Sequence, residues 1–370
     1  MEILWFLMTA ALLLVIVRAW IRRRRGGVGP QLVAPGSPDA ADPADYGFVR
    51  QEQLDIRVPG PDEDLMDALA VVQGTQQWKA ASRLLAGTPA EGEQRWQRVQ
   101  AFAGAAALEL AQQPGSGARW LKAWRLEAEE DPGGAQVHAE FLVQQAWRQS
   151  GGVGSTDHRI ILEEAREACA KAAALAPDDP VPYITELAVA RGLAYPPAEF
   201  DVLWAKVIDR APAHMGAHIA ALHYLCAKWH GSREQADAFA QAAAARAPQG
   251  SLLAALPLFA LYEHLPDMAL VQDFFGTAVV SRAVEGAMYA VRGARADDPM
   301  LPHVRHLLVF FLVNGERWTE AIEQVGHVDG YVGALPWSHD ADPAHMYAVF
   351  RALAVGGYEA NGGSPATLPH

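Results

Sequence analysis

A regular spacing of Ala-Pro pairs constrains the fold of this chain more than any other feature of its sequence. Three such pairs follow one another at intervals of 35 and 36 residues: Ala176-Pro177, Ala211-Pro212 and Ala247-Pro248. Because proline cannot continue a helix, each pair predicts a helix end. Two helical stripes lie between successive pairs, over residues 181–192 and 199–210, and then over 214–230 and 232–246. The spacing therefore predicts two-helix units that stack on one another.

Apolar side chains recur with the period of an α-helix through most of the chain. In one stripe they fall at positions i, i+3, i+4, i+7 and i+8: Phe200, Leu203, Trp204, Val207 and Ile208. The same pattern returns at 280–288 and at 304–312. Each stripe makes one apolar face that must pack against a neighbouring helix. Few runs alternate as a strand would, and Gln51–Val58 is the best candidate, so the sequence predicts an all-α protein.

The stretch from about Ile161 to His264 resembles tetratricopeptide-type helical repeats. Its units end in APDDP (176–180), APAHM (211–215) and APQGS (247–251), where that family often has a proline after the second helix. The family's Trp, Leu-Gly and Tyr positions are not reproduced, so the repeats are divergent. Residues 228–251 also resemble a segment of an uncharacterised bacterial helical domain of unknown function. The resemblance implies a solenoid of α-α hairpins and supplies no catalytic residue.

Several helix ends are marked by their own residues. Ser232, followed by Gln235, is a capping box, so a helix should begin after Ser232. Pro257 lies six residues after the expected cap at Ser251 and should kink that helix or delay its start. Asn314-Gly315 predicts a helix end.

The N-terminus carries the pattern of a membrane anchor. Residues 3–17 contain no charge, and a helix over residues 3–21 would be about 28 Å long, close to the thickness of a bilayer's hydrocarbon core. Four arginines follow at 22–25, whereas a secretory signal peptide has its positive charges before the apolar run. The arginines predict an N-terminus outside and a body in the cytoplasm. We thus expect a single-pass protein of the cell membrane.

Composition then divides the rest of the chain. A Gly-, Pro-, Ala- and Asp-rich tether follows the basic flank and precedes the helical body, and a Gly- and Pro-rich tail closes the chain. The predicted parts are an anchor with its basic flank (1–25), a flexible linker (26–45), an N-terminal helical region (46–150), the repeat region (151–355) and a disordered tail (356–370).

The charge of the chain excludes one large class of partners. After residue 25 the chain has 25 Lys and Arg against 42 Asp and Glu, a net charge of −17. Nucleic-acid binding requires clustered basic residues on the binding surface, so we expect no nucleic-acid partner. The acidic run Glu127–Asp131 is either a solvated helix end or part of a patch that binds a protein partner.

The residue types that carry chemistry give no catalytic or metal-binding motif. His214 and His218 are four residues apart and His303 and His306 three apart, but no third ligand accompanies either pair. His223 falls in an apolar stripe. The only cysteines, Cys169 and Cys226, also lie in apolar stripes, as expected for buried structural thiols. We therefore predict no catalytic, cofactor-binding or metal-binding residues, and no cofactor.

Four tryptophans at helical positions, Trp78, Trp120, Trp124 and Trp147, are expected in the core, with a ligand platform as the alternative. The expected function is a membrane-anchored, non-catalytic scaffold or adaptor that holds an unidentified protein partner. Two alternatives remain. One is a membrane-tethered enzyme whose site is formed by scattered helix residues. The other is a regulatory domain that senses a small molecule.

Overall fold

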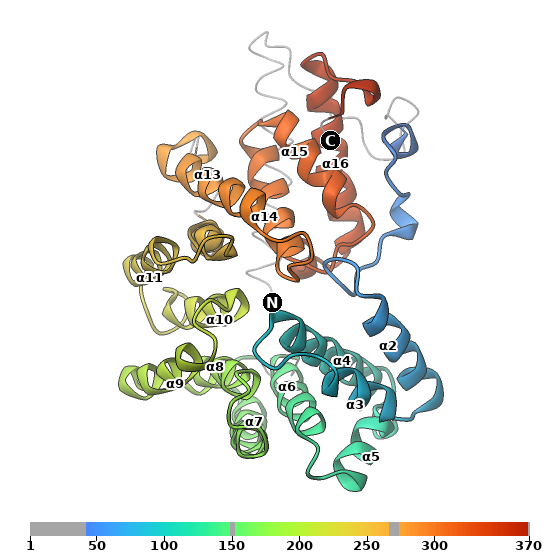
Figure 1. Cartoon of the computed structure of the whole chain (residues 1–370), viewed down its shortest axis with the longest axis vertical. Coiled ribbons are helices and arrows are strands. Elements are labelled where there is room, and N and C mark those ends of the chain that lie inside the picture. The colour runs from blue at the N-terminus through green and yellow to red at the C-terminus, as the bar shows by residue number, and fades with distance from the viewer. Residues whose placement is uncertain (1–41, 149–151, 266–273, 369–370) are drawn as a thin grey trace. The chain divides into compact units, whose positions relative to one another are not determined.

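The computed structural model describes residues 42–148, 152–265 and 274–368 (Figure 1). Within them the protein is all-α, as predicted, and its only β-type pairing is an isolated bridge between Asp55 and Tyr331. None of the helices in this part of the chain is both long enough and apolar enough to cross a bilayer. The predicted anchor over residues 3–21 and most of the linker lie outside the described residues.

The described residues form two compact units, which differ from the predicted partition. Unit 2 is the continuous stretch Asp62–Pro248. Unit 1 combines the segment before it, up to Pro61, with everything from Gln249 onward. The sequence suggested a boundary near residue 150, but α6 and α7 on either side of it pack closely together. Long-range packing between helices defines these two units.

The described residues of unit 2 form ten α-helices. They are α2 (Glu63–Thr75), α3 (Lys79–Ala86), α4 (Glu93–Gln112), α5 (Arg119–Glu127), α6 (Pro132–Trp147), α7 (Thr156–Leu175), α8 (Val181–Leu193), α9 (Pro197–Arg210), α10 (Met215–Leu225) and α11 (Arg233–Ala245). The predicted pairs correspond to α8 with α9 and α10 with α11, and α10 ends five residues earlier than expected. The helices before the three Ala-Pro pairs end at Leu175, Arg210 and Ala245, as the spacing predicted.

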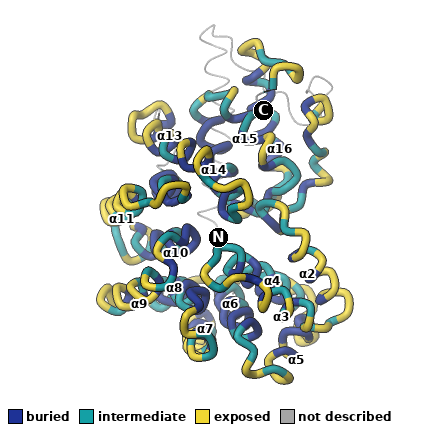
Figure 2. Tube along the Cα trace, viewed as in Figure 1, coloured by how far each residue is buried: buried dark blue, intermediate teal, exposed yellow. Residues whose placement is uncertain are grey.

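Helix α6 is the centre of unit 2. It contacts α3, α4, α5, α7 and α8, and most of its residues are buried, so it has no exposed polar face. Figure 2 shows the contrast with α9 and α11, which are exposed over much of their surface. A β-carbon at Gly134 would lie 2.8 Å from Trp124 Nε1. Glycine, a poor helix former, is thus required where α6 meets this ring.

The tryptophans divide between the core and its edge. Trp120 and Trp124 are fully buried, as expected. Trp78 is half-buried and stacks on Trp124, and Trp147 is half-buried against His158 and Trp229. The two cysteines are buried, as their apolar stripes predicted.

Trp204 on α9 is also half-buried, not a core residue of the stripe. Its ring meets His218 of α10 and Phe239 of α11 edge-on, at centroid distances of 5.0 and 5.4 Å. We expect Trp204→Ala to lower the free energy of unfolding by about 2 kcal/mol, below the ~3–5 kcal/mol of a fully buried tryptophan. Denaturant unfolding followed by circular dichroism measures this, and a loss near zero would contradict the packing between α9, α10 and α11.

Unit 1 is built around α14. Its elements are η1 (Pro43–Tyr46), η2 (Gln51–Gln53), η3 (Leu252–Ala255), α12 (Leu256–Glu263), η4 (Phe274–Gly276), α13 (Ala278–Gly293), α14 (Leu301–Asn314), α15 (Trp318–Val328), η5 (Trp337–His339), α16 (Pro343–Ala360) and η6 (Pro365–Thr367). Helix α14 is buried on nearly all sides and contacts α13, α15 and α16. Its apolar composition, FFLV near its end, fits a helix covered by neighbours.

The predicted helix ends in both units are confirmed. Ser232 accepts a hydrogen bond from Gln235 N at the start of α11, and Ser251 does so from Leu253 N. Pro257 delays a helix: a short 3₁₀ turn follows Ser251, and α12 begins only at Leu256, with Pro257 in its first turn. Gly315 follows the last residue of α14.

Two expectations about unit 1 are wrong. Residues 51–58 do not form a strand: a 3₁₀ turn takes 51–53, and Asp55 makes a single bridge by pairing with Gly330 O and Val332 N. The C-terminus does not become a frayed tail at residue 356. Helix α16 continues to Ala360, and the Tyr358 hydroxyl bonds to Thr367 beyond the following turn. The Gly- and Pro-rich composition reflects this turn.

Candidate functional site

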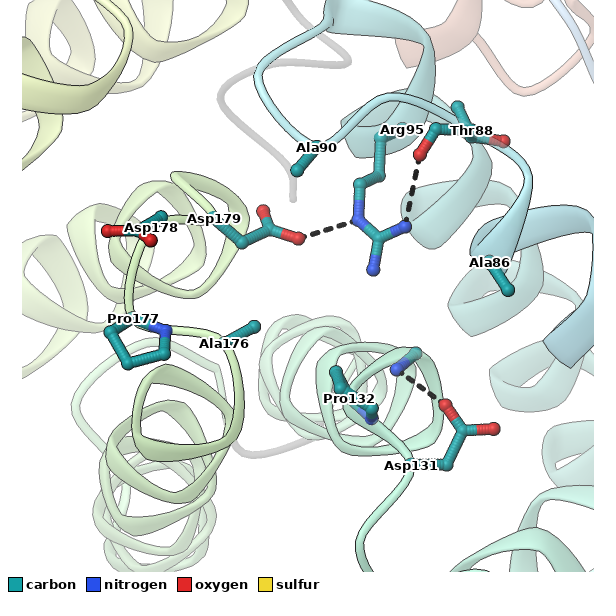
Figure 3. Close-up of a pocket in the computed structure, with 11 residues that line it drawn as sticks. Ala86, Thr88, Ala90, Arg95, Asp131, Pro132, Ala176, Pro177, Asp178 and Asp179 are labelled. Atoms are coloured by element: carbon teal, nitrogen blue, oxygen red, sulfur yellow. Dashed lines mark hydrogen bonds and ion pairs between the residues drawn. The ribbon is translucent and has the colours of Figure 1, made fainter.

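An open pocket lies inside unit 2, where three turns between helices meet. It is a pocket of about 510 Å³ lined by the following residues: Ala86, Thr88, Ala90, Arg95, Asp131, Pro132, Gly133, Ala176, Pro177, Asp178 and Asp179. They come from the end of α3, the α3–α4 turn, the start of α4, the α5–α6 turn with the start of α6, and the α7–α8 turn (Figure 3). Successive helices run up and down, so the N-termini of α4, α6 and α8 gather at one end.

Each of two helix starts is fixed by an aspartate just before a proline. Asp131 precedes Pro132, and its Oδ1 accepts a hydrogen bond from Gly133 N at 2.9 Å. Asp179 precedes Pro180, and its Oδ1 accepts one from Val181 N at 2.9 Å. Aspartate satisfies the free N–H groups of a helix start, and proline there has no N–H to satisfy. Local capping thus places two carboxylates at the pocket wall.

A buried arginine connects these helices. Arg95 Nε donates to Asp179 Oδ2 at 2.6 Å, and its Nη1 donates to the carbonyl oxygens of Leu85 and Thr88. The Arg95 side chain is 9% exposed and that of Asp179 only 3%. Gln136 Nε2 adds a second bond to Asp179 Oδ2 at 2.7 Å. Buried charges of this kind are tolerated because the pair and its neighbours satisfy one another.

Apart from the exposed Asp178, the remaining polar side chains of the wall are already engaged. Asp131 Oδ2 accepts from Ser82 Oγ at 2.6 Å and from Trp124 Nε1 at 3.0 Å. The Thr88 hydroxyl donates to Leu84 O and accepts from Arg98 Nη1. One donor remains: Arg95 Nη2 has no partner among the described residues, and Figure 3 shows it directed into the open space between Asp179 and Pro132.

The acidic run Glu127–Asp131 is neither simply solvated nor a single patch. Glu127 accepts from Trp78 Nε1 at 3.0 Å, Glu129 pairs with Lys171 Nζ at 2.7 Å, and Asp131 belongs to the pocket. Lys171 holds the pKa of the Glu129 carboxyl below its usual value. The run therefore connects α5 and the start of α6 to α3 and α7, and only its last residue reaches the site.

The histidines are placed as structural residues. His214 caps α10, with Nδ1 accepting from Ala217 N at 3.1 Å and Glu93 Oε2 lying 3.0 Å away. His218, buried in the next turn, contacts the His214 carbonyl through Nδ1 at 2.9 Å, and its burial lowers its pKa. Neither histidine lines the pocket. Nowhere in the described ranges do three or more His, Cys, Asp or Glu residues form a group that could hold a metal ion.

The two histidines of the second pair, His303 and His306, have different surroundings. His306 of α14 is completely buried, and its Nδ1 accepts from Trp337 Nε1 at 2.9 Å. Its Nε2 lies 3.1 Å from Pro59 O, so it donates there as neutral imidazole. Burial lowers the pKa of His306 to about 3. His303 is half-buried on the same helix.

Glu140 of α6 is a buried acid outside the pocket. Burial raises its pKa to about 7, although Gln144 Nε2 and Thr185 Oγ1 donate to its carboxyl at 3.0 and 3.1 Å. The unfolded chain gives up this proton near pH 4.5, whereas the folded protein keeps it until about pH 7. The Glu140 carboxyl therefore contributes fully to stability below pH 4.5. As the pH rises to 7, the free energy of unfolding loses about 3 kcal/mol of that contribution.

We expect Glu140→Gln to raise the free energy of unfolding by about 1–3 kcal/mol at pH 8 and to change it little at pH 4.5. Burial lowers the pKa of His138 to about 3, so this histidine has the opposite pH dependence. It lowers the free energy of unfolding below pH 6.5, equally in the unaltered chain and in Glu140→Gln. The difference between the two proteins thus isolates Glu140. Urea unfolding from pH 4.5 to 8 measures it, and a difference independent of pH would show that the carboxyl is ionised when folded.

Sequence reasoning missed Arg95, Asp179 and Gln136, the centre of the site. The signals were local but easily overlooked: Arg95 and Arg98 are three residues apart beside the apolar stripe of α4, and the Asp-Pro pairs mark helix starts. Comparisons of the chain with protein-family models, with curated proteins and with solved structures found no match.

Proposed function

We propose that the protein is a membrane-anchored, non-catalytic scaffold or adaptor whose cytoplasmic, helical-repeat body holds a protein partner. One observation carries the proposal. The pocket of unit 2 is open, and its wall offers a single unused hydrogen-bond donor, Arg95 Nη2. A wall of this kind can recognise an acceptor, and the one carboxylate of its lining without a partner among the described residues, Asp178, is exposed.

The chemistry of the lining favours binding over catalysis. An acid–base or nucleophilic site needs a side chain that can give or take a proton at the substrate. The Thr88 hydroxyl is engaged on both sides, and the oxygens of Asp131 and Asp179 accept hydrogen bonds within the protein. The other lining side chains are Ala, Pro, Gly, Arg95 and the exposed Asp178.

The anchor and the tetratricopeptide-like character rest on the sequence. The uncharged run over 3–17, within a candidate helix over 3–21, and Arg22–Arg25 support insertion with the body in the cytoplasm. The pairs α8–α9 and α10–α11 recur at the predicted spacing, which supports a repeat of α-α hairpins. Such arrays typically bind peptides or helices along their surface.

Partner capture tests this function directly. The full chain would be crosslinked in cells, extracted in a mild detergent and purified, and the proteins retained would be compared with those retained by an unrelated single-pass protein. We expect one protein retained in a fixed ratio to the chain. Retention of none, together with turnover of a small molecule by the purified chain, would favour the enzyme alternative.

The topology gives a separate prediction. Because the arginines follow the apolar run, a reporter active only outside the cell should be inactive when fused after residue 45 or at the C-terminus. Moving Arg22–Arg25 ahead of Ile3 should invert part of the population and activate the reporter. Activity of both fusions of the unaltered chain would show that the body lies outside.

A further inference from the structure

We propose that the pocket of unit 2 receives a basic peptide segment of the partner, with a main-chain carbonyl on Arg95 and a lysine or arginine side chain near Asp178. This inference rests on the proposed scaffold function and names the chemistry of its partner. It is built from three features of the pocket: an unused donor on a largely buried side chain, an excess of carboxylates and an aliphatic lining.

The unused donor determines what must face it. Arg95 Nη2 belongs to a side chain that is 9% exposed, and its other two nitrogens are fixed by Asp179 and by the carbonyls of Leu85 and Thr88. The N–H groups of Nη2 therefore point in a fixed direction, into the pocket (Figure 3). A guanidinium donor fixed in this way selects a hydrogen-bond acceptor placed against it.

The surrounding charges favour a neutral acceptor. The lining contains three aspartates, Asp131, Asp178 and Asp179, against the single positive charge of Arg95. Asp179 already neutralises Arg95 at 2.6 Å. An anionic group would thus meet net negative charge, whereas a peptide carbonyl takes the hydrogen bond without that repulsion.

The rim favours a cation beside that carbonyl. Asp178 is exposed, and its carboxylate takes part in no hydrogen bond or ion pair with the described residues. The lining beside it is formed by Ala176 and Pro177, and Ala90 of the α3–α4 turn adds another aliphatic side chain to the wall (Figure 3). An aliphatic wall ending at a carboxylate fits a lysine or arginine, whose stem is apolar and whose tip is charged.

The pocket suits part of a peptide better than a whole small molecule. Small-molecule sites place several polar groups around one ligand, and here only one side-chain donor of the lining has no partner among the described residues. A peptide gains its remaining contacts outside the pocket, on the helices beside it. The net charge of −17 after residue 25 would also speed association with a basic segment.

The test measures binding of a fluorescein-labelled octapeptide of alternating lysine and alanine, with blocked ends, to the full chain in non-ionic detergent. Fluorescence anisotropy gives the affinity, and a glutamate–alanine octapeptide is the charge control. Ala176→Phe fills the pocket without changing charge and should weaken binding at least about tenfold. Asp178→Asn should weaken it about two- to fivefold, the effect of one exposed ion pair.

Matched variants on α9, away from the pocket lining, separate the site from general attraction. Ala205→Phe and Asp201→Asn make the same chemical changes at exposed positions and should leave the affinity unchanged. Circular dichroism verifies that each variant is folded, and Ala90→Phe replaces Ala176→Phe if that variant is not.

Two results would overturn the inference. Equal binding by all variants would show non-specific attraction to an acidic surface. Free arginine competing as strongly as the octapeptide would show a small-molecule pocket. The scaffold function is tested separately. If Ala176→Phe still captures a partner in cells, the scaffold function stands, but this pocket is not where the partner binds.

Discussion

Replacing Arg95 by alanine should lower the free energy of unfolding by about 3–5 kcal/mol. The substitution leaves the Asp179 carboxylate, 3% exposed, without its ion-pair partner at 2.6 Å. It also leaves the carbonyls of Leu85 and Thr88 without the guanidinium that they share. An uncompensated buried charge accounts for most of the expected loss, since the intact pair itself contributes little net stability. Denaturant unfolding measures it, and hydrogen exchange should quicken first in α4, α6 and α8.

Arg166→Ala is the matched control for this prediction. Arg166 also pairs with a carboxylate, Glu199 at 2.7 Å, but both side chains are more than 40% exposed. Exposed pairs of this kind contribute about 0–1 kcal/mol. Equal small losses for Arg95→Ala and Arg166→Ala would mean that the pocket wall is hydrated and that Arg95 is not held in the position described.

The second large effect is expected in unit 1, where Arg351→Ala should also cost about 3–5 kcal/mol. Arg351 Nη1 donates to Asp329 Oδ1 at 2.6 Å and to Val49 O at 2.8 Å. Asp329 Oδ2 in turn accepts from Val49 N at 2.6 Å. The two side chains, 4% and 8% exposed, thus hold the N-terminal segment 42–61 against α15 and α16. Loss of the Arg351 side chain should be visible as faster hydrogen exchange at the backbone amides of Val49 and Asp55.

Arg295→Ala provides the comparison within the same unit. Among the described residues Arg295 forms an ion pair with Asp297, and both side chains are more than 70% exposed, so its removal should change the free energy of unfolding little. If exchange in residues 42–61 is unchanged in Arg351→Ala, the segment is held by other contacts, such as those of Tyr46 with Glu359 and of Pro59 with His306.

Features that depend on neighbouring residues could be predicted from the sequence. Ser232, Pro257 and Gly315 act on the backbone within a few residues, so each marked its helix end correctly. The burial of Trp120 and Trp124 followed from their size and helical spacing. The burial of Trp204 was overestimated, because an apolar stripe shows which face of a helix packs but not how completely the next helix covers that face.

Features that join distant parts of the chain could not be predicted in this way. The contacts of residues 42–61 with the C-terminal helices span some 250 to 310 residues, and no periodicity carries that information. Arg95 and Asp179 are 84 residues apart, and each looks like an ordinary surface charge in isolation. The candidate site was therefore missed: its capping aspartates are local features, but their convergence on one arginine is a product of packing.

Photo-crosslinking from the pocket in cells tests the central claim, that this body holds a protein partner at that site. A photoreactive amino acid would replace Ala86, which is exposed and lines the pocket, and, as the control, the exposed Ala205 on α9. We expect one discrete protein adduct from position 86 that is absent from position 205 and reduced by Ala176→Phe. No adduct from position 86, or the same adducts from both positions, would contradict a scaffold that binds its partner through this pocket.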